Sequence, residues 1–407
     1  MHHISQHSAH KNDVCYDTES KISWCLYRNM KGGSLRRTIR VDQPGREIGM
    51  LDMTARQMID RFADTSLSPL EYARSLVAHI ERWKLALGAL YAYDPQALLE
   101  AAALSEVRWQ SGMPCGILDD VPVTLKELIA TQDHPIPQGS PDSTLIPARA
   151  NAPVADRLKE ISAIIFVKTT APDLGMLSSG FSTFHTLILN PWELSCNPDG
   201  SSAGAAAGYG PLGFKLSLGR IPVDPYYTGR CASPMTRTVG DAALMMNALA
   251  MITGPPGVGR NCATCPKANW GRSRRSSVHE PNAAGMSTER VLDGLGKTFA
   301  MRRACIALFG DVDAVLSPIT PNISFPAENA GPTNDPERSF EHIVYTVPWN
   351  ISEQPAISIN CGFSSTGMPI GHQIIAPRFA DLTVLKMATT YEVLRGSMPR
   401  WPQAPST

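Results

Sequence analysis

The sequence predicts an α/β fold, a single large domain whose mixed, mostly parallel sheet is covered by helices on both faces. Two observations predict it. Short apolar runs alternate with segments of helical periodicity, which is typical of βαβ units. The chain has 407 residues, long enough to bury a large core. We expect the domain to span residues 50–402.

Charge and composition exclude several classes of protein. Lys plus Arg and Asp plus Glu both number 37, so no basic surface for nucleic acid is expected. The longest apolar run, residues 242–252, is interrupted by Asn247 and is too short to cross a bilayer. The first residues contain no apolar signal segment. Nine scattered cysteines indicate reduced thiols. We therefore expect a soluble, cytoplasmic protein with no nucleic-acid or membrane partner.

The N-terminal part of the chain differs from the rest. Residues 1–49 contain many His, Ser, Lys and Arg residues without sustained periodicity, and we expect a disordered or spurious extension there. Patterned sequence begins near Met50. The run Ser-Pro-Leu-Glu at 68–71 predicts a helix start with a capping box, and apolar residues then recur at helical spacing. A second helix is expected around residues 95–109.

The remaining elements are assigned from the same two kinds of periodicity. In chain order they are a strand at 121–125, a helix at 153–161, a buried strand at 164–167, strands at 357–361 and 370–375, and a helix at 381–394. The turn at 364–367 joins the last two strands, which predicts a hairpin.

Residues 254–290 fit neither pattern, and we expect an irregular surface insertion there. Its start, Gly-Pro-Pro-Gly-Val-Gly-Arg-Asn, is similar to a phosphate-binding loop. However, Arg260 and Asn261 stand where Lys and Ser or Thr must reach phosphate and magnesium. Cys262 and Cys265 lack a second pair of zinc ligands. We therefore expect no cofactor and no metal.

Two short segments contain residues suited to catalysis. Gly-Ser-Ser-Ala at 200–203 leaves hydroxyl groups beside a tight turn, a setting for acyl transfer, but it also suits a plain turn before an Ala-rich helix. Lys126 ends an apolar strand. Such a lysine is usually exposed to solvent, although burial among apolar neighbours would make it a base near neutral pH. The residues alone leave both alternatives open.

Together, several segments resemble the amidase signature family in sequence and in order, over about residues 50–402. The matching segments are Gly-Ile-Leu-Asp-Asp-Val-Pro-Val-Thr-Leu-Lys-Glu at 116–127, Val-Lys-Thr-Thr-Ala-Pro-Asp-Leu-Gly at 167–175, His185 with Asn-Pro-Trp at 190–192, Pro-Asp-Gly-Ser-Ser-Ala-Gly at 198–204, residues 234–243 and residues 349–358. The resemblance implies an amidase-type domain and a cytoplasmic hydrolase of carbon–nitrogen bonds in small-molecule amides. A homodimer is one assembly that it allows.

The resemblance also implies a Ser-Ser-Lys catalytic unit. In the family a neutral lysine takes a proton through a bridging serine, which lies in a cis-peptide setting, and a second serine attacks the amide carbonyl. Lys126 matches the base and Ser201 matches the bridging serine. Ser202 matches the neighbouring motif serine, which would otherwise satisfy backbone groups of the turn.

The chain departs from the family pattern after Leu212. The family continues with Gly-Thr-Asp-x-Gly-Gly-Ser, which carries the nucleophile and the backbone N–H groups that hold the oxyanion. Here the chain passes directly to Gly-Phe-Lys-Leu-Ser-Leu-Gly-Arg-Ile-Pro at 213–222, so about twenty residues are expected to be missing. Ser217 lies beside the segment that matches beyond the gap, and we expect it to be a bystander. Ser202 is a substitute nucleophile without a matching oxyanion hole.

Two hypotheses for function follow. The first is an amidase of the Ser-Ser-Lys type that acts on a small linear or aromatic amide. The second is a catalytically inactive, locally truncated remnant, either a pseudoenzyme or the product of a degraded gene. A glutamyl-tRNA amidotransferase component of the A type is a weaker enzyme alternative, because it would need partner proteins. The substrate and the oligomeric state stay open.

Overall fold

The computed structural model describes residues 25–27, 49–210, 212–223, 229–250, 286–338, 340–396 and 401–402. Most of the predicted extension at 1–49 and of the predicted insertion at 254–290 lies outside these residues. Within the extension, Cys25–Tyr27 form a short strand. Within the insertion, a helix begins at Thr288.

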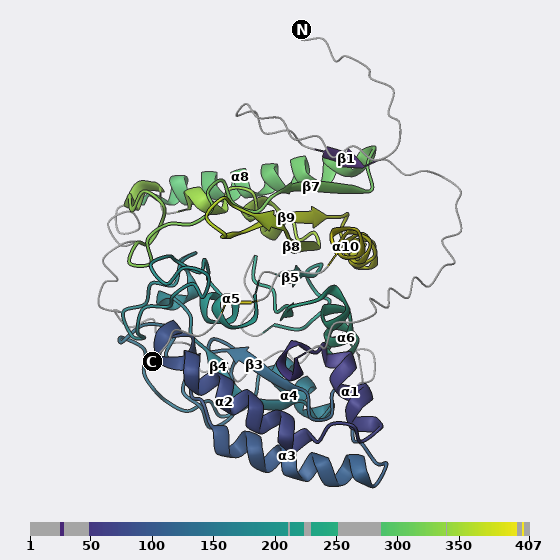
Figure 1. Cartoon of the computed structure of the whole chain (residues 1–407). Coiled ribbons are helices and arrows are strands. Elements are labelled where there is room, and N and C mark those ends of the chain that lie inside the picture. The colour runs from purple at the N-terminus through teal and green to yellow at the C-terminus, as the bar shows by residue number, and fades with distance from the viewer. Residues whose placement is uncertain are drawn as a thin grey trace.

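The strands form two sheets (Figure 1). The six-stranded sheet has the order β1-β7-β9-β8-β5-β6, with β1 at Cys25–Tyr27, β5 at Leu212–Lys215, β6 at Met235–Thr236, β7 at Ala314–Pro318, β8 at Ala356–Phe363 and β9 at Pro369–Ile375. The three-stranded sheet has the order β2-β4-β3, with β2 at Leu90–Tyr91, β3 at Pro122–Lys126 and β4 at Ile164–Thr169.

The α/β fold class is confirmed, but the prediction of a mostly parallel sheet is wrong. Among the described strands only β3 and β4 pair in parallel, and all other pairs are antiparallel. The strand-helix-strand unit predicted at 121–167 does form, as β3, α4 (Pro153–Glu160) and β4, and it supplies this one parallel pair. The larger sheet instead contains the predicted hairpin, β8 and β9, and strands that arrive from distant parts of the chain. Such pairings leave no trace in local periodicity.

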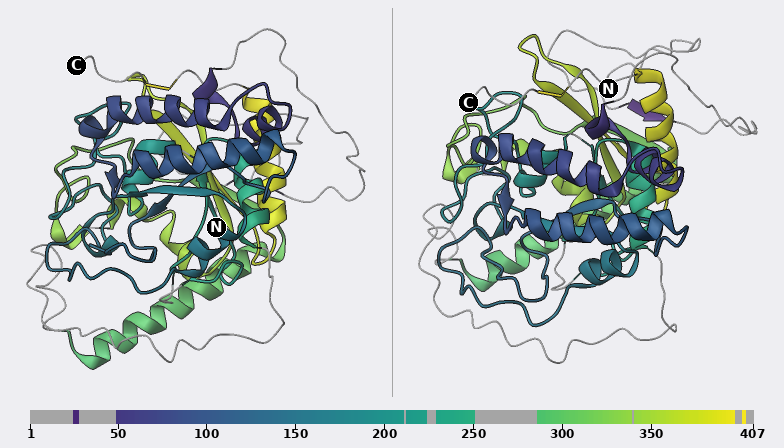
Figure 2. Two further views of the ribbon diagram at one scale, coloured as in Figure 1. Left: turned by 90° about the horizontal axis from the view of Figure 1, so that it is seen from below. Right: turned by 60° about the horizontal axis from the view of Figure 1, so that its bottom comes forward.

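Helices lie on both outer sides of the sheets. The remaining α-helices are α1 (Ala55–Ala63), α2 (Pro69–Leu87), α3 (Pro95–Gln110), α5 (Ala203–Tyr209), α6 (Val239–Leu249), α8 (Thr288–Ala307), α9 (Val347–Ile351) and α10 (Asp381–Arg395). Helices α2 and α3 run side by side next to the three-stranded sheet, and α8 lies at the opposite end of the molecule (Figures 1 and 2). Each sheet therefore has a helical cover on its outer side.

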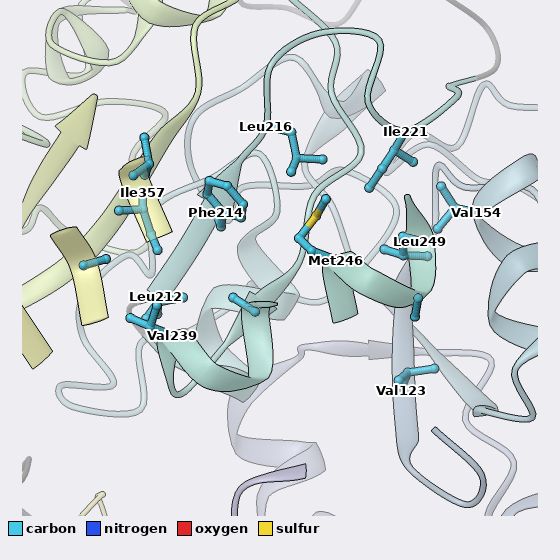
Figure 3. Packing of buried hydrophobic residues seen from close by; sticks show 14 of the residues in the cluster. Val123, Val154, Leu212, Phe214, Leu216, Ile221, Val239, Met246, Leu249 and Ile357 are labelled. Carbon is cyan, nitrogen blue, oxygen red and sulfur yellow. The ribbon is translucent and has the colours of Figure 1, made fainter. Parts of the chain in front are cut away.

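One apolar core joins the two sheets. Figure 3 shows Val123 of β3, Phe214 of β5, Leu249 of α6 and Ile357 of β8 packed in the same cluster. Phe214 and Ile357 are almost completely buried, with exposures of 1% and 0%. The core thus fixes the end of β3, where Lys126 lies, relative to the end of β5.

None of the helices in the described part of the chain combines the length and the apolar character needed to cross a membrane.

Candidate active site

Lys126 and Ser201, which are 75 positions apart, meet in the structure. Lys126 is the last residue of β3, whose alternating side chains bury Val123 and Leu125 on the core side. Its ammonium group donates a hydrogen bond to Ser201 Oγ at 2.9 Å. The structure therefore brings together the two residues that the sequence singled out as base and bridging serine.

Close backbone packing positions the serine turn. The peptide bond between Gly200 and Ser201 is cis, the setting that the family resemblance implies. Helix α5 follows, and a Cβ atom added to Gly204 would lie 2.4 Å from Ala89 O and 2.7 Å from Thr170 N. Only glycine permits this approach, so α5 rests directly on the end of β4 and holds the turn against Lys126.

The surroundings of Lys126 favour its neutral form. Removal of the ammonium group from water lowers the pKa of Lys126 to about 7. The carboxylate of Glu127 acts against this change, and the guanidinium of Arg230 adds to it. A general base works best when its pKa lies near the working pH. Lys126 can therefore accept a proton near neutral pH.

Glu127, the residue after Lys126, is a fully buried carboxylate. Glu127 Oε1 accepts a hydrogen bond from Ala171 N at 2.7 Å, and Glu127 Oε2 lies 2.8 Å from His185 Nε2. Lys168 donates to Ile129 O at 2.6 Å, and burial lowers the pKa of Lys168 to about 8, while Glu127 raises it. Glu127 thus provides negative charge to both lysines. Sequence reasoning gave Glu127 and Lys168 no role, although both lie inside the matching segments.

Ser202 has a free hydroxyl group in the described part of the structure. It occupies the N-cap position of α5, yet its side chain makes no capping bond and no other hydrogen bond with a described residue. The plain alternative, a hydroxyl that satisfies backbone groups of the turn, is therefore not what the structure has.

Ser217 is engaged elsewhere. Its hydroxyl donates to Asp381 Oδ2 at 2.8 Å and accepts from Phe379 N at 2.7 Å, and only 1% of the residue is exposed. These bonds tie the segment after β5 to the start of α10. Ser217 is also not among the residues that line the cavity described next, which fits the prediction that it is a bystander.

A cavity of about 600 Å³ opens beside the lysine and the serines. The residues that line it include Lys126, Ser201, Ser202, Lys215 and Arg230. Its size is that of a pocket for a small molecule. Within the described residues, no group of three His, Cys, Asp or Glu side chains converges to hold a metal ion.

Known proteins resemble this chain over most of its length. The sequence model of the family described as Amidase matches residues 71–219 and 267–385. An acylamidase of Rhodococcus erythropolis is 24% identical over 455 aligned residues, which cover 84% of this chain and 95% of that protein. The A component of the glutamyl-tRNA(Gln) amidotransferase of Myxococcus xanthus (strain DK1622) is 24% identical over 479 aligned residues, with 84% of this chain and 97% of that protein covered.

A solved structure has the same fold. The crystal structure of an amidase superimposes with a TM-score of 0.71 at 18% identity, covering 84% of this chain and 100% of the amidase chain.

The alignments with the acylamidase and the amidotransferase component, 455 and 479 residues long, are both longer than this chain, which has 407 residues. Both curated relatives therefore contain segments that have no counterpart here.

Proposed function

The chain belongs to the amidase family, and from this premise we propose that its cavity binds a small amide whose carbon–nitrogen bond it hydrolyses, with Lys126 as base and Ser201 as proton relay. One observation carries the proposal. The ammonium of Lys126 lies 2.9 Å from Ser201 Oγ at the wall of the cavity, and the pKa of this lysine is lowered to about 7.

The proton path follows from this geometry. Neutral Lys126 accepts the proton of Ser201, and Ser201 accepts the proton of the hydroxyl that attacks the amide carbonyl. As the carbon–nitrogen bond breaks, the proton returns through Ser201 to the leaving nitrogen. Water then attacks the acyl ester, gives its proton to the same relay and releases the acid.

We also propose that the segment with the family's usual nucleophile is absent and that Ser202 attacks in its place. The expected gap follows Leu212, the first residue of β5, and the chain continues there with Gly-Phe-Lys-Leu-Ser-Leu-Gly-Arg-Ile-Pro at 213–222, which contains no Gly-Thr-Asp-x-Gly-Gly-Ser segment. The curated relatives contain segments without counterparts here, in agreement with this proposal. Ser202 is adjacent to Ser201, lines the cavity and has no hydrogen-bond partner among the described residues.

Absence of that segment would make the enzyme slow. Loss of one oxyanion donor costs about 2.7–4 kcal/mol of transition-state stabilisation, or roughly 10²–10³ in kcat. The same absence favours the second candidate function, an inactive remnant that binds an amide without hydrolysing it.

Release of ammonia from a panel of small linear and aromatic amides decides between these candidates. We expect slow turnover that Lys126→Ala, Ser201→Ala and Ser202→Ala each abolish. Ser365→Ala, in the exposed turn of the β8–β9 hairpin, is the matched control and keeps the activity. Turnover that survives Ser202→Ala contradicts the proposed nucleophile. Absence of turnover in the folded chain supports the inactive remnant.

Two further proposals concern the type of substrate and the cellular compartment of the protein. We rank hydrolysis of a free amide above action on a charged tRNA, because the formal net charge of zero provides no excess of cations for phosphate. We place the protein in the cytoplasm, because five cysteines in the described part of the chain are free thiols, as expected in a reducing compartment.

A further inference from the structure

Asn197 lies shortly before Ser201 in the chain and is buried, with 3% of the residue exposed. Its side-chain Nδ2 donates a hydrogen bond to Ala327 O at 3.3 Å, and its backbone N–H donates to Phe325 O at 2.9 Å. Ala327 lies 130 positions further along the chain. Asn197 is therefore anchored to a segment that is distant in sequence.

The oxygen of the same side chain binds two stretches of backbone next to the serine turn. Asn197 Oδ1 accepts hydrogen bonds from Asp199 N at 2.8 Å and from Gly180 N at 3.1 Å. Asp199 has a φ of 70°, in the left-handed region that side chains seldom adopt, and the first bond supports it. The second bond joins this stretch to the loop at 178–180. One amide oxygen thus connects two separate parts of the chain.

The serine turn packs directly on that loop. A Cβ atom added to Gly200 would lie 2.7 Å from both Ser179 N and Ser179 O. Gly200 forms the peptide bond with Ser201, whose Oγ accepts the hydrogen bond from Lys126. A shift of the loop at 178–180 would therefore move Ser201 relative to Lys126.

A buried histidine supports the same loop. His342 is 0% exposed, and its Nε2 lies 2.7 Å from Ser178 O. Because a carbonyl oxygen can only accept, Nε2 carries the proton and donates it. The ring of His342 packs edge-on against Phe325, with 5.2 Å between ring centroids, and Phe325 O accepts from Asn197 N. His342 and Asn197 therefore join the same distant segment to the surroundings of the serine turn.

We propose that Asn197 is a positioning residue of the active site: by joining the stretch before Ser201 to the loop at 178–180, it keeps Ser201 Oγ at Lys126. The effect on the reaction rests on the proposed function, whereas the effect on the loop does not require turnover. A displacement of about 1 Å caused by a residue away from the chemistry can cost about 10²-fold in rate. An apolar side chain at 197 would leave two N–H groups without their acceptor.

Two variants of Asn197 separate its hydrogen bonds from its volume. Asn197→Leu fills the space but removes the acceptor, whereas Asn197→Asp keeps an oxygen for both N–H groups. For ammonia release per folded chain, we expect kcat to fall roughly 10–100-fold in Asn197→Leu with KM unchanged, and to fall much less in Asn197→Asp. Equal losses in the two variants, or no loss in Asn197→Leu, would overturn the inference.

Asn360→Leu is the matched control. Asn360 is also buried, with 1% exposed, and it bonds to the backbone of Gly362 through Nδ2 at 2.8 Å and Oδ1 at 3.2 Å. It lies in β8 and is not among the described residues that line the cavity. Asn360→Leu should destabilise the fold and leave kcat per folded chain unchanged. A loss of kcat as large as that in Asn197→Leu would contradict the positioning role.

His342 provides a second pair of variants, which also applies if Asn197→Leu does not fold. His342→Gln keeps an N–H group for Ser178 O, and His342→Leu does not. We expect kcat per folded chain to fall in His342→Leu and to be largely restored in His342→Gln. Equal kcat values in these two variants would contradict the role given to the loop at 178–180.

Amide hydrogen exchange tests the loop without turnover. In Asn197→Leu, peptides that contain Gly180 and Asp199 should exchange at least about tenfold faster, because their N–H groups lose the acceptor, and peptides of the β8–β9 hairpin should not change. Unchanged exchange rejects the role of Asn197 whether or not the chain is active.

The two proposals therefore fail separately. Faster exchange with unchanged kcat keeps the proposed function and rejects the positioning role. Faster exchange in a chain that releases no ammonia rejects the proposed function and keeps the role of Asn197 in holding the serine turn.

Discussion

At Lys126, an ammonium group lies between two opposite charges, the carboxylate of Glu127 and the guanidinium of Arg230. Glu127 favours the charged lysine, and Arg230 disfavours it. Because both groups act on the pKa of Lys126, replacement of either one should shift that pKa in a known direction.

We therefore expect Glu127→Gln and Arg230→Gln to move the pH dependence of the reaction in opposite directions. The base is active when neutral, so the rate rises with pH through the pKa of about 7. Loss of the Glu127 charge lowers that pKa and moves the rise to lower pH. Loss of the Arg230 charge moves it to higher pH. Ammonia release measured across the neutral pH range checks both shifts, and movement of both in the same direction would exclude this charge balance.

The lowered pKa of Lys126 also has a cost in stability. An unfolded lysine titrates near 10.4, so between that value and about 7 the unfolded chain binds more protons than the folded one. The free energy of unfolding therefore decreases as pH falls through this window, and the full penalty is present below about pH 7.

We expect Lys126→Met to stabilise the fold at about pH 6.5, on the order of 1–3 kcal/mol, because it removes this penalty while it removes the base. The gain should shrink as pH rises toward about 10. Urea denaturation at about pH 6.5 and about pH 9.5 measures it, with Lys386→Met as the exposed control. A gain that is independent of pH would show that desolvation of the amine is not its cause.

At the scale of elements, helix α5 holds the serine turn through one close approach. Gly204 packs against the backbone of Ala89 and Thr170, whereas nothing lies within 4 Å of a Cβ atom added to Gly208. The two glycines therefore form a matched pair within one helix.

Gly204→Ala should destabilise the protein by about 1–3 kcal/mol through overpacking and should displace Ser201 from Lys126. Gly208→Ala should stabilise it by about 0.5–1 kcal/mol through helix propensity. Thermal melts compare the two variants, and ammonia release reports the displacement. Equal effects on the melting temperature would mean that α5 does not rest on β4 as described.

Local sequence patterns predicted the positions of helices and strands better than they predicted the contacts that these elements make. The helix starts at Pro69 as predicted, and Ser68 Oγ accepts from Glu71 N at 3.2 Å. The return bond of the predicted capping box, from Ser68 N to the Glu71 side chain, is not formed. Ser68 Oγ also donates a hydrogen bond to Glu106 of α3. The complete capping box belongs to Thr54 and Gln57, which sequence reasoning missed. The bond between Ser68 and Glu106 joins two helices, and no short window of sequence contains both residues.

At the scale of the whole molecule, the cavity lies where two sheets share one core. The proximity of Lys126 and Ser201 could be expected from the family resemblance, because both lie in matching segments. The position of Lys215 and Arg230 at the same cavity could not be expected from the sequence. It depends on the packing of β5 against β8 and on antiparallel pairings that periodicity does not encode.

Phe214→Ala tests this shared core. The ring is 1% exposed and belongs to the apolar cluster that spans both sheets (Figure 3). We expect a loss of about 3–5 kcal/mol in the free energy of unfolding and a single cooperative transition in both proteins. Two separate transitions in the unmodified chain would mean that the sheets do not fold as one unit.

The central claim is that Lys126 and Ser201 activate Ser202 without the family's usual nucleophile. Labelling the full chain with a fluorophosphonate, followed by mass spectrometry of its peptides, tests this most directly. We expect one phosphonyl adduct on Ser202, formed faster as pH rises through about 7 and lost in Lys126→Ala. An adduct on Ser201 or Ser217, or a folded chain that forms none, would contradict the claim.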